Sequence, residues 1–121
     1  MKIAIFPGKN TPLKRYKSYF TNIELYIPTQ HDKPNIVLCH SLGYKHAIEF
    51  CINNNIYPKI VVMDGVVLEQ DVSDLDIVFF CPYDKQPPLV KRVIIYEVAE
   101  LKHYPYMHKN IRNKIIKELL N

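Results

Sequence analysis

The sequence predicts an α/β fold with a mainly parallel sheet of about six strands flanked by a few helices. Two observations lead to this prediction. The strand-like segments are continuous β-branched and aromatic runs with little polar alternation, which is typical of strands buried on both faces of a parallel sheet. Segments with the spacing of amphipathic helices lie between several of these runs, and that alternation is typical of α/β proteins.

The expected strands are spread along the whole chain. They are Lys2 to Phe6, Ile23 to Ile27, Ile36 to Cys39, Ile60 to Met63, Ile77 to Cys81 and Val93 to Val98. Two connections between them, 27–35 and 65–76, carry prolines or acidic residues in place of a helical pattern. We therefore expect extended loops at these two places.

The first expected helix follows Thr11 and Pro12, a pair typical of an N-cap and a first helical residue. Leu13, Tyr16 and Phe20 then space out along one face of this helix, which indicates the side that packs on the sheet. The helix is therefore expected to begin at Pro12 with Thr11 as its cap.

Two further helices are expected from 42 to 54 and from 107 to 120. The first ends in three asparagines, one of which can adopt the left-handed cap conformation. Its predicted buried stripe is Tyr44, Ala47, Ile48, Cys51 and Ile52. The predicted inward face of the last helix is Ile111, Ile115, Ile116, Leu119 and Leu120.

Size and composition restrict the class of protein. A chain of 121 residues fits a single domain over residues 1–121, and 48% apolar residues are enough for one core. No apolar run approaches the roughly 20 residues of a membrane span, and the first residues do not resemble a signal peptide. Three cysteines without close pairing favour a reducing compartment, so we expect a cytoplasmic protein. The net charge of +4 comes from scattered lysines, so no nucleic-acid partner is expected.

The most informative segment is Ile36-Val37-Leu38-Cys39-His40-Ser41-Leu42-Gly43, in which a buried strand runs directly into an amphipathic helix. A serine at such a turn is held in a strained backbone conformation above the sheet, and its neighbours must be small. The amide of Leu42 then lies at a helix N-terminus, where it can donate to a developing oxyanion. The pattern predicts a nucleophile elbow at Ser41, although a serine that only caps the helix fits the same position.

The segment resembles the G-H-S-x-G elbow of the α/β-hydrolase superfamily, the lipase and esterase-like serine hydrolases. It matches at His40, Ser41 and Gly43 and differs at Cys39, where the family usually has glycine. In the family the histidine before the nucleophile usually packs locally. The resemblance implies a minimal α/β-hydrolase core, in a compact form that lacks the family's first strands and its lid.

The resemblance also implies an acid and a base in the order serine, acid, histidine. Asp84 in Tyr83-Asp84-Lys85-Gln86-Pro87-Pro88 resembles the family's acid loop, and His103 in Lys102-His103-Tyr104-Pro105-Tyr106 resembles its histidine loop. The expected triad is therefore Ser41, Asp84 and His103. His108 stays open as an alternative base. Asp64 stays open as an alternative acid, although a turn or cap role is the simpler interpretation.

A second oxyanion donor is expected in the loop after the first strand, Pro7-Gly8-Lys9, from the amide of Gly8 or Lys9. An ordinary turn glycine explains Gly8 equally simply. The nearby cations Lys9, Lys14, Arg15 and Lys17 are expected to be a solvated surface.

No metal and no cofactor are expected. His40, His46, His103 and His108 show no ligand spacing, and no nucleotide-binding glycine pattern is present. Cys39, Cys51 and Cys81 are expected to be small core residues, although Cys39 stays open as a minor alternative nucleophile.

The sequence thus predicts a serine hydrolase for a small acyl ester, thioester or amide, with a small-molecule acyl substrate. The missing lid indicates an open site and small or soluble substrates. The missing helices leave part of the sheet uncovered, so a homodimer is also expected. The alternatives are a degenerate hydrolase fold that serves as a binding or interaction module, and a nucleotide-binding domain.

Overall fold

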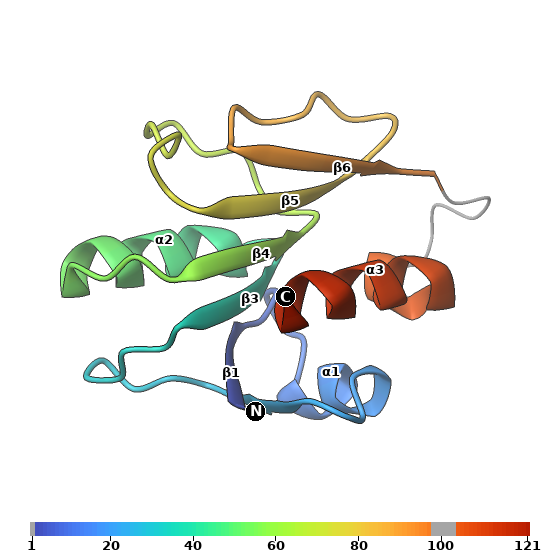
Figure 1. The fold of residues 1–121 in the computed structure, drawn as a ribbon, viewed down its shortest axis with the longest axis horizontal. Helices are drawn as coiled ribbons and strands as arrows, with labels where there is room; N and C mark the ends of the chain where they lie inside the picture. The colour runs from blue at the N-terminus through green and yellow to red at the C-terminus, as the bar shows by residue number, and fades with distance from the viewer. Residues whose placement is uncertain (1, 98–103) are drawn as a thin grey trace.

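The computed structural model describes residues 2–97 and 104–121, which form a six-stranded sheet with helices on both faces (Figure 1). The strands are β1 (Lys2–Phe6), β2 (Glu24–Tyr26), β3 (Ile36–His40), β4 (Lys59–Met63), β5 (Ile77–Pro82) and β6 (Arg92–Tyr96). The helices are α1 (Leu13–Tyr19), α2 (Gly43–Asn54), the short 3₁₀ helix η1 (Pro105–Met107) and α3 (Lys109–Leu120). All neighbouring strands are parallel, so the predicted fold class is confirmed.

The order of the strands in the sheet is β2-β1-β3-β4-β5-β6. The chain moves from β1 to β2 on one side, returns past β1 to β3, and then continues in the other direction to β6. The connections that follow β1 and β3 therefore leave the same edge of the sheet in opposite directions. Such a switch point, at the carboxyl ends of parallel strands, is where open α/β sheets bind ligands.

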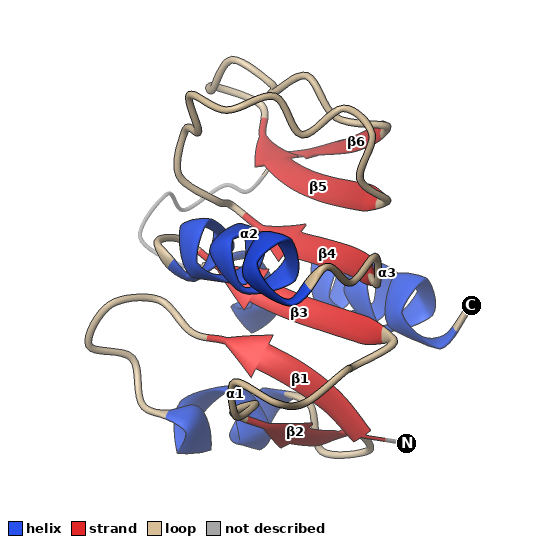
Figure 2. Ribbon diagram, turned by 90° about the vertical axis from the view of Figure 1, so that its left-hand side faces the viewer, coloured by secondary structure: helices blue, strands red, loops and turns tan. Residues whose placement is uncertain are grey.

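The two faces of the sheet are covered differently (Figure 2). Helices α1 and α3 cover one face, and α2 covers the other together with the helix-free connections 65–76 and 83–91. This division is what right-handed crossovers produce when the chain changes direction at β1. The expected loops at 27–35 and 65–76 are confirmed, and the loop at 65–76 leaves part of the α2 face without a helical cover.

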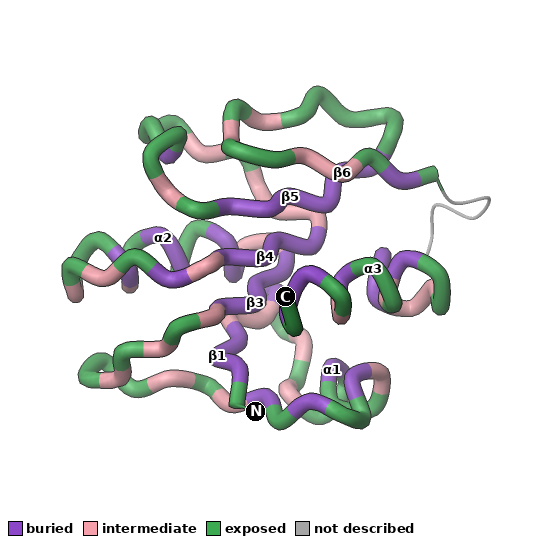
Figure 3. The backbone as a smooth tube through the Cα atoms, in the orientation of Figure 1, coloured by how far each residue is buried: buried purple, intermediate pink, exposed green. Residues whose placement is uncertain are grey.

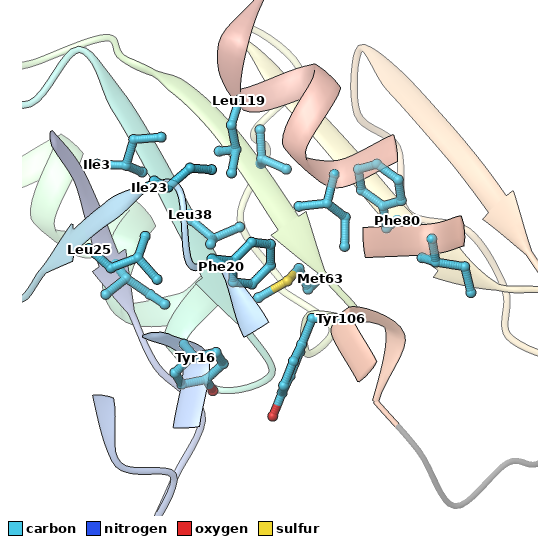
Figure 4. Packing of buried hydrophobic residues seen from close by; sticks show 14 of the residues in the cluster. Ile3, Tyr16, Phe20, Ile23, Leu25, Leu38, Met63, Phe80, Tyr106 and Leu119 are labelled. Carbon is cyan, nitrogen blue, oxygen red and sulfur yellow. The ribbon is translucent and has the colours of Figure 1, made fainter. Parts of the chain in front are cut away.

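Two apolar layers result, and the central strands contribute to both. Figure 3 shows that β4 and β5 are buried along most of their length. On the α1 and α3 face, alternate residues of the strands pack against aromatic rings, among which Tyr16, Phe20 and Tyr106 lie close together (Figure 4). On the other face, Ala47, Ile48 and Cys51 of α2 pack on the strands. Burial of a side chain as large as that of Ile48 contributes roughly 1.5–3 kcal/mol to stability. The predicted core positions of the three cysteines are confirmed, because all three are buried and free.

Several predicted boundaries and faces need correction. The N-cap of α1 is Pro12 and not Thr11, because Pro12 still has extended backbone and the helix begins at Leu13. Ile52 and Leu120 were predicted to face inward, but they are 56% and 52% exposed. Each directly follows a buried residue, Cys51 or Leu119, and so lies about 100° around the helix from that residue, outside the buried stripe. The predicted left-handed asparagine is confirmed at Asn55, with φ of 52°. Val98, expected to end the last strand, lies outside the described residues.

A buried carboxylate attaches α3 to the sheet. Glu118 is 6% exposed, and its Oε1 lies 2.7 Å from Arg92 Nη2 of β6. Its Oε2 accepts a hydrogen bond from Arg92 Nη1 at 2.9 Å and lies 3.5 Å from Lys59 Nζ of β4. A buried charge is tolerated when it is paired and hydrogen-bonded in this way. The paired carboxylate therefore fixes α3 across β4 and β6. Within the described ranges, no helix has the length and apolar character needed to cross a bilayer.

Candidate active site

Ser41 occupies a strained turn between β3 and α2. Its φ is 54°, in the left-handed region that costs a non-glycine residue about 1–3 kcal/mol. Backbone hydrogen bonds hold it in place: its N–H donates to Met63 O at 3.4 Å, and its carbonyl accepts from Tyr44 N at 3.2 Å and Val66 N at 3.3 Å. The predicted strained conformation is confirmed, and strain of this kind is concentrated at functional sites.

Gly43 explains how the turn fits against β1. A Cβ atom at this position would lie 2.0 Å from Phe6 O and 2.7 Å from Pro7 O, both of them backbone atoms. Only glycine allows the start of α2 to approach the end of β1 this closely. The predicted need for a small residue is therefore confirmed at Gly43, two residues after the serine, and its effect is to bring the helix N-terminus beside the loop that follows β1.

The loop after β1 lies directly against the serine. A Cβ atom at Gly8 would lie 3.4 Å from Ser41 Cβ and 3.1 Å from His40 Nδ1, and Gly8 is buried. The structure thus brings together the two segments that the sequence predicts to form an oxyanion site. They come from neighbouring strands at the switch point of the sheet.

The backbone amides at this point are not equivalent. The Gly8 N–H donates to Tyr16 Oη at 2.9 Å, so this amide is already engaged. Within residues 2–97 and 104–121, the amides of Lys9 and Leu42 donate to no protein group. Leu42 is the N-cap residue of α2, where the helix dipole adds positive potential. Of the predicted donors, Lys9 and Leu42 therefore have the amides that are available to an oxyanion.

A buried polar chain, which the sequence did not predict, supports the Gly8 loop. His40 and Tyr16 are 2% and 0% exposed, and Tyr16 Oη lies 2.8 Å from His40 Nδ1. Tyr16 Oη therefore accepts the Gly8 amide proton and also shares a hydrogen bond with the ring of His40. Tyr104 and Tyr106 enclose this ring, with centroids 4.6 and 5.4 Å from it.

Burial lowers the pKa of His40 to about 4, a shift that nearby Asp64 opposes and Lys85 reinforces. In the unfolded chain the pKa is near 6.5, so between these values the unfolded chain binds a proton that the folded protein excludes. The contribution of neutral His40 to the free energy of unfolding is therefore fully present above pH 6.5. It is lost as the pH falls toward 4. We expect His40 to remove about 2–3 kcal/mol of stability between pH 7.5 and 4.5.

Urea unfolding of wild type and His40→Gln at both pH values measures this loss. The free energy of unfolding should fall with acidification by about 2–3 kcal/mol more in wild type than in the variant. Equal pH dependence in the two proteins would show that His40 is not excluded from protonation.

The structure describes the surroundings of the predicted acid, Asp84, but not those of the predicted base, His103. Asp84 lies in an exposed turn after β5, and no hydrogen bond or ion pair joins it to another described side chain. His103 lies outside the described residues. Its neighbour in the sequence, Tyr104, packs on the ring of His40, the residue before Ser41. No side chain in the described ranges hydrogen-bonds to the Ser41 hydroxyl, so the contacts of a triad stay a prediction.

The alternative residues have other environments. Asp64 follows β4 with φ of 50°, and its Oδ1 lies 2.9 Å from Lys85 Nζ. It is a turn residue with an ion-pair partner. His108 is the N-cap residue of α3, and its carbonyl accepts from Arg112 N at 2.8 Å. Burial raises the pKa of the Cys39 thiol, which keeps it protonated and makes it a poor nucleophile.

The described part of the chain contains no group of three or more histidine, cysteine or acidic side chains placed to hold a metal ion. Comparison of the chain with protein-family models, curated proteins and solved structures found no match. The fold and the site therefore define the class: a parallel α/β protein with a strained serine at the switch point of its sheet.

Proposed function

We propose that the protein is a serine hydrolase that cleaves a small acyl ester, thioester or amide through an acyl-enzyme on Ser41. The observation that carries this proposal is the left-handed Ser41 at the strand–helix turn, with the available amides of Leu42 and Lys9 on its two flanking loops. This combination resembles the nucleophile elbow and oxyanion loop of the α/β-hydrolase superfamily. Strain at this position costs stability, and a catalytic role accounts for its presence.

In the proposed reaction, Ser41 Oγ attacks the substrate carbonyl and gives its proton to the imidazole of His103. The negative charge on the carbonyl oxygen is stabilised by the amides of Leu42 and Lys9. The imidazolium then protonates the leaving group, and water attacks the acyl-enzyme by the same route. Asp84 is proposed to orient the imidazole and to stabilise its charged form.

Two features support this acid and base. Asp84 follows β5, so it leaves the same edge of the parallel sheet as Ser41 does after β3. His103 precedes Tyr104, which packs on His40 next to the nucleophile. The proposed reaction requires a serine, a base and an acid that meet at one edge of the sheet.

A series of p-nitrophenyl esters tests the proposal. We expect wild type to hydrolyse them with an initial burst, and His103→Ala to lose about 10³-fold or more in kcat. His108→Ala is the matched control and should stay within a few-fold of wild type.

An inert wild-type protein would favour the second candidate, a binding or interaction module on a degenerate hydrolase fold. The exposure of Asp84, which makes no hydrogen bond to a described residue, is the observation that favours this alternative. If His108→Ala loses activity and His103→Ala retains it, the general base is His108 and not His103.

A further inference from the structure

A cavity of about 730 Å³ lies on the α2 face of the sheet and is lined by residues of the two helix-free connections 65–76 and 83–91. Its lining includes Tyr44 of α2 and Phe79 and Cys81 of β5. This volume lies within the roughly 300–1,000 Å³ of sites that bury small molecules. The cavity exists because the sequence places loops where crossover helices would otherwise cover the sheet.

The cavity begins beside the nucleophile, although Ser41 itself does not line it. Val66, which lines the cavity, donates its N–H to the carbonyl of Ser41 at 3.3 Å. Asp64 and Lys85 also line it, and Asp64 directly follows Met63, the strand partner of His40. The edge of the cavity therefore lies next to the backbone of Ser41 and includes the Asp64–Lys85 ion pair.

Apolar side chains from both loops face this cavity without a cover. Val67 and Leu89 are 94% and 90% exposed, and each comes from a different loop of the lining. Exposed apolar side chains in the lining of a cavity gain from an apolar occupant that removes them from water. The ring of Tyr44 packs edge-on against Phe79, with centroids 5.5 Å apart.

Tyr44 contributes its ring to the cavity wall. The residue is 1% exposed, and its hydroxyl is shielded from solvent and has no hydrogen-bond partner among the described residues. Burial raises the pKa of this hydroxyl, so it stays protonated. Because the hydroxyl oxygen is closed off from solvent, the contribution of Tyr44 to the lining is apolar.

The charges of the lining select against anions. Three carboxylates, Asp64, Glu69 and Asp71, face one cation, Lys85, which is already paired with Asp64. An additional negative charge on the ligand would be repelled here. An uncharged ligand fits this lining best.

The proposed reaction indicates which part of the substrate enters. The acyl group stays bonded to Ser41 in the proposed acyl-enzyme, whereas the leaving group departs before water attacks. The cavity begins beside the backbone of Ser41, at the N–H of Val66. The acyl group is therefore the part of the substrate that a cavity at this place holds.

We infer that this cavity binds the uncharged apolar acyl group of the substrate, so that the enzyme prefers acyl chains longer than acetyl. The inference rests on the proposed function. It predicts that kcat/KM for p-nitrophenyl acetate, butanoate and hexanoate rises by roughly fourfold for each methylene that becomes buried. The hemisuccinate ester, which adds a negative charge to a four-carbon acyl group, should react more slowly than the butanoate.

Val67→Asp tests the cavity, because Val67 is exposed and its replacement leaves the core intact. The ratio of hexanoate to acetate kcat/KM should fall at least tenfold in this variant. Ile52→Asp, which changes an exposed residue of α2 outside the cavity lining, is the matched control and should keep the wild-type ratio. A flat chain-length series, or equal ratios in both variants, would overturn the inference while leaving the hydrolase proposal intact.

A binding measurement separates the two proposals. Methyl hexanoate is titrated into Ser41→Ala, which cannot turn it over, and amide chemical shifts of residues 65–73 are followed by NMR. Saturable shifts that Val67→Asp weakens support the cavity even if wild type hydrolyses no ester. The absence of shifts at millimolar methyl hexanoate would overturn the inference whatever the activity of the wild type.

Discussion

Ser41→Ala is expected to lower kcat for p-nitrophenyl ester hydrolysis by about 10³- to 10⁶-fold, because it removes the nucleophile and with it the covalent route. The backbone amides of Leu42 and Lys9 remain in the variant, so a small residual rate from transition-state stabilisation should persist. KM should change much less than kcat. The measurement is steady-state hydrolysis of one ester by wild type and variant at the same pH.

The control for this experiment is a second substitution of Ser41 that relieves the strain of its left-handed backbone. Ser41→Gly should also be inactive, but it relieves the left-handed strain of Ser41 and should raise the free energy of unfolding by about 1 kcal/mol. An inactive variant that is more stable than wild type separates the loss of the nucleophile from loss of the fold. Retention of more than a tenth of wild-type kcat in Ser41→Ala would contradict the assignment of the nucleophile.

Gly43→Ala is expected to destabilise the protein by at least about 3 kcal/mol, as measured by urea unfolding. The new Cβ would lie 2.0 Å from Phe6 O, and this contact cannot be relieved by rotating a side chain because Phe6 O belongs to the backbone of β1. Either α2 or the end of β1 must move, and both carry amides of the proposed oxyanion site. We therefore expect activity to be lost along with stability.

Gly8→Ala is the matched comparison. The nearest atoms to a Cβ at Gly8 belong to side chains, at 3.1 Å for His40 Nδ1 and 3.4 Å for Ser41 Cβ. Small rearrangements can relieve these contacts, so the loss of stability should be about 1 kcal/mol. Equal destabilisation by the two substitutions would show that the close approach at Gly43 is not what fixes the turn.

The strands were predictable because a strand that is buried on both faces appears in the sequence as a continuous apolar run. Runs such as Ile77 to Phe80 contain only apolar residues, and a parallel sheet under two layers is the structure that requires this. The turn at Ser41 was also predictable, since a strand that runs into a helix with Gly43 two residues after the serine leaves few backbone solutions. These features are local in sequence.

The features that sequence analysis missed depend on residues far apart in the chain. Tyr16 reads as one more apolar position of α1, yet its hydroxyl joins Gly8 to His40, which is 24 residues away. The exposure of Ile52, one residue after buried Cys51, shows that the buried stripe of α2 is narrower than its apolar spacing indicates. The cavity forms between two loops whose mutual packing has no periodic signal. For the same reason, the sequence could name Asp84 as an acid without giving its distance from any base.

The most direct measurement is mass spectrometry of the protein after incubation with a fluorophosphonate, which reacts covalently with activated serines. Our account predicts a single phosphonyl adduct on the tryptic peptide that contains Ser41, absent from Ser41→Ala and much slower to form in His103→Ala. An unmodified wild-type protein, or an adduct of equal yield in Ser41→Ala, would contradict the proposal that Ser41 is an activated nucleophile.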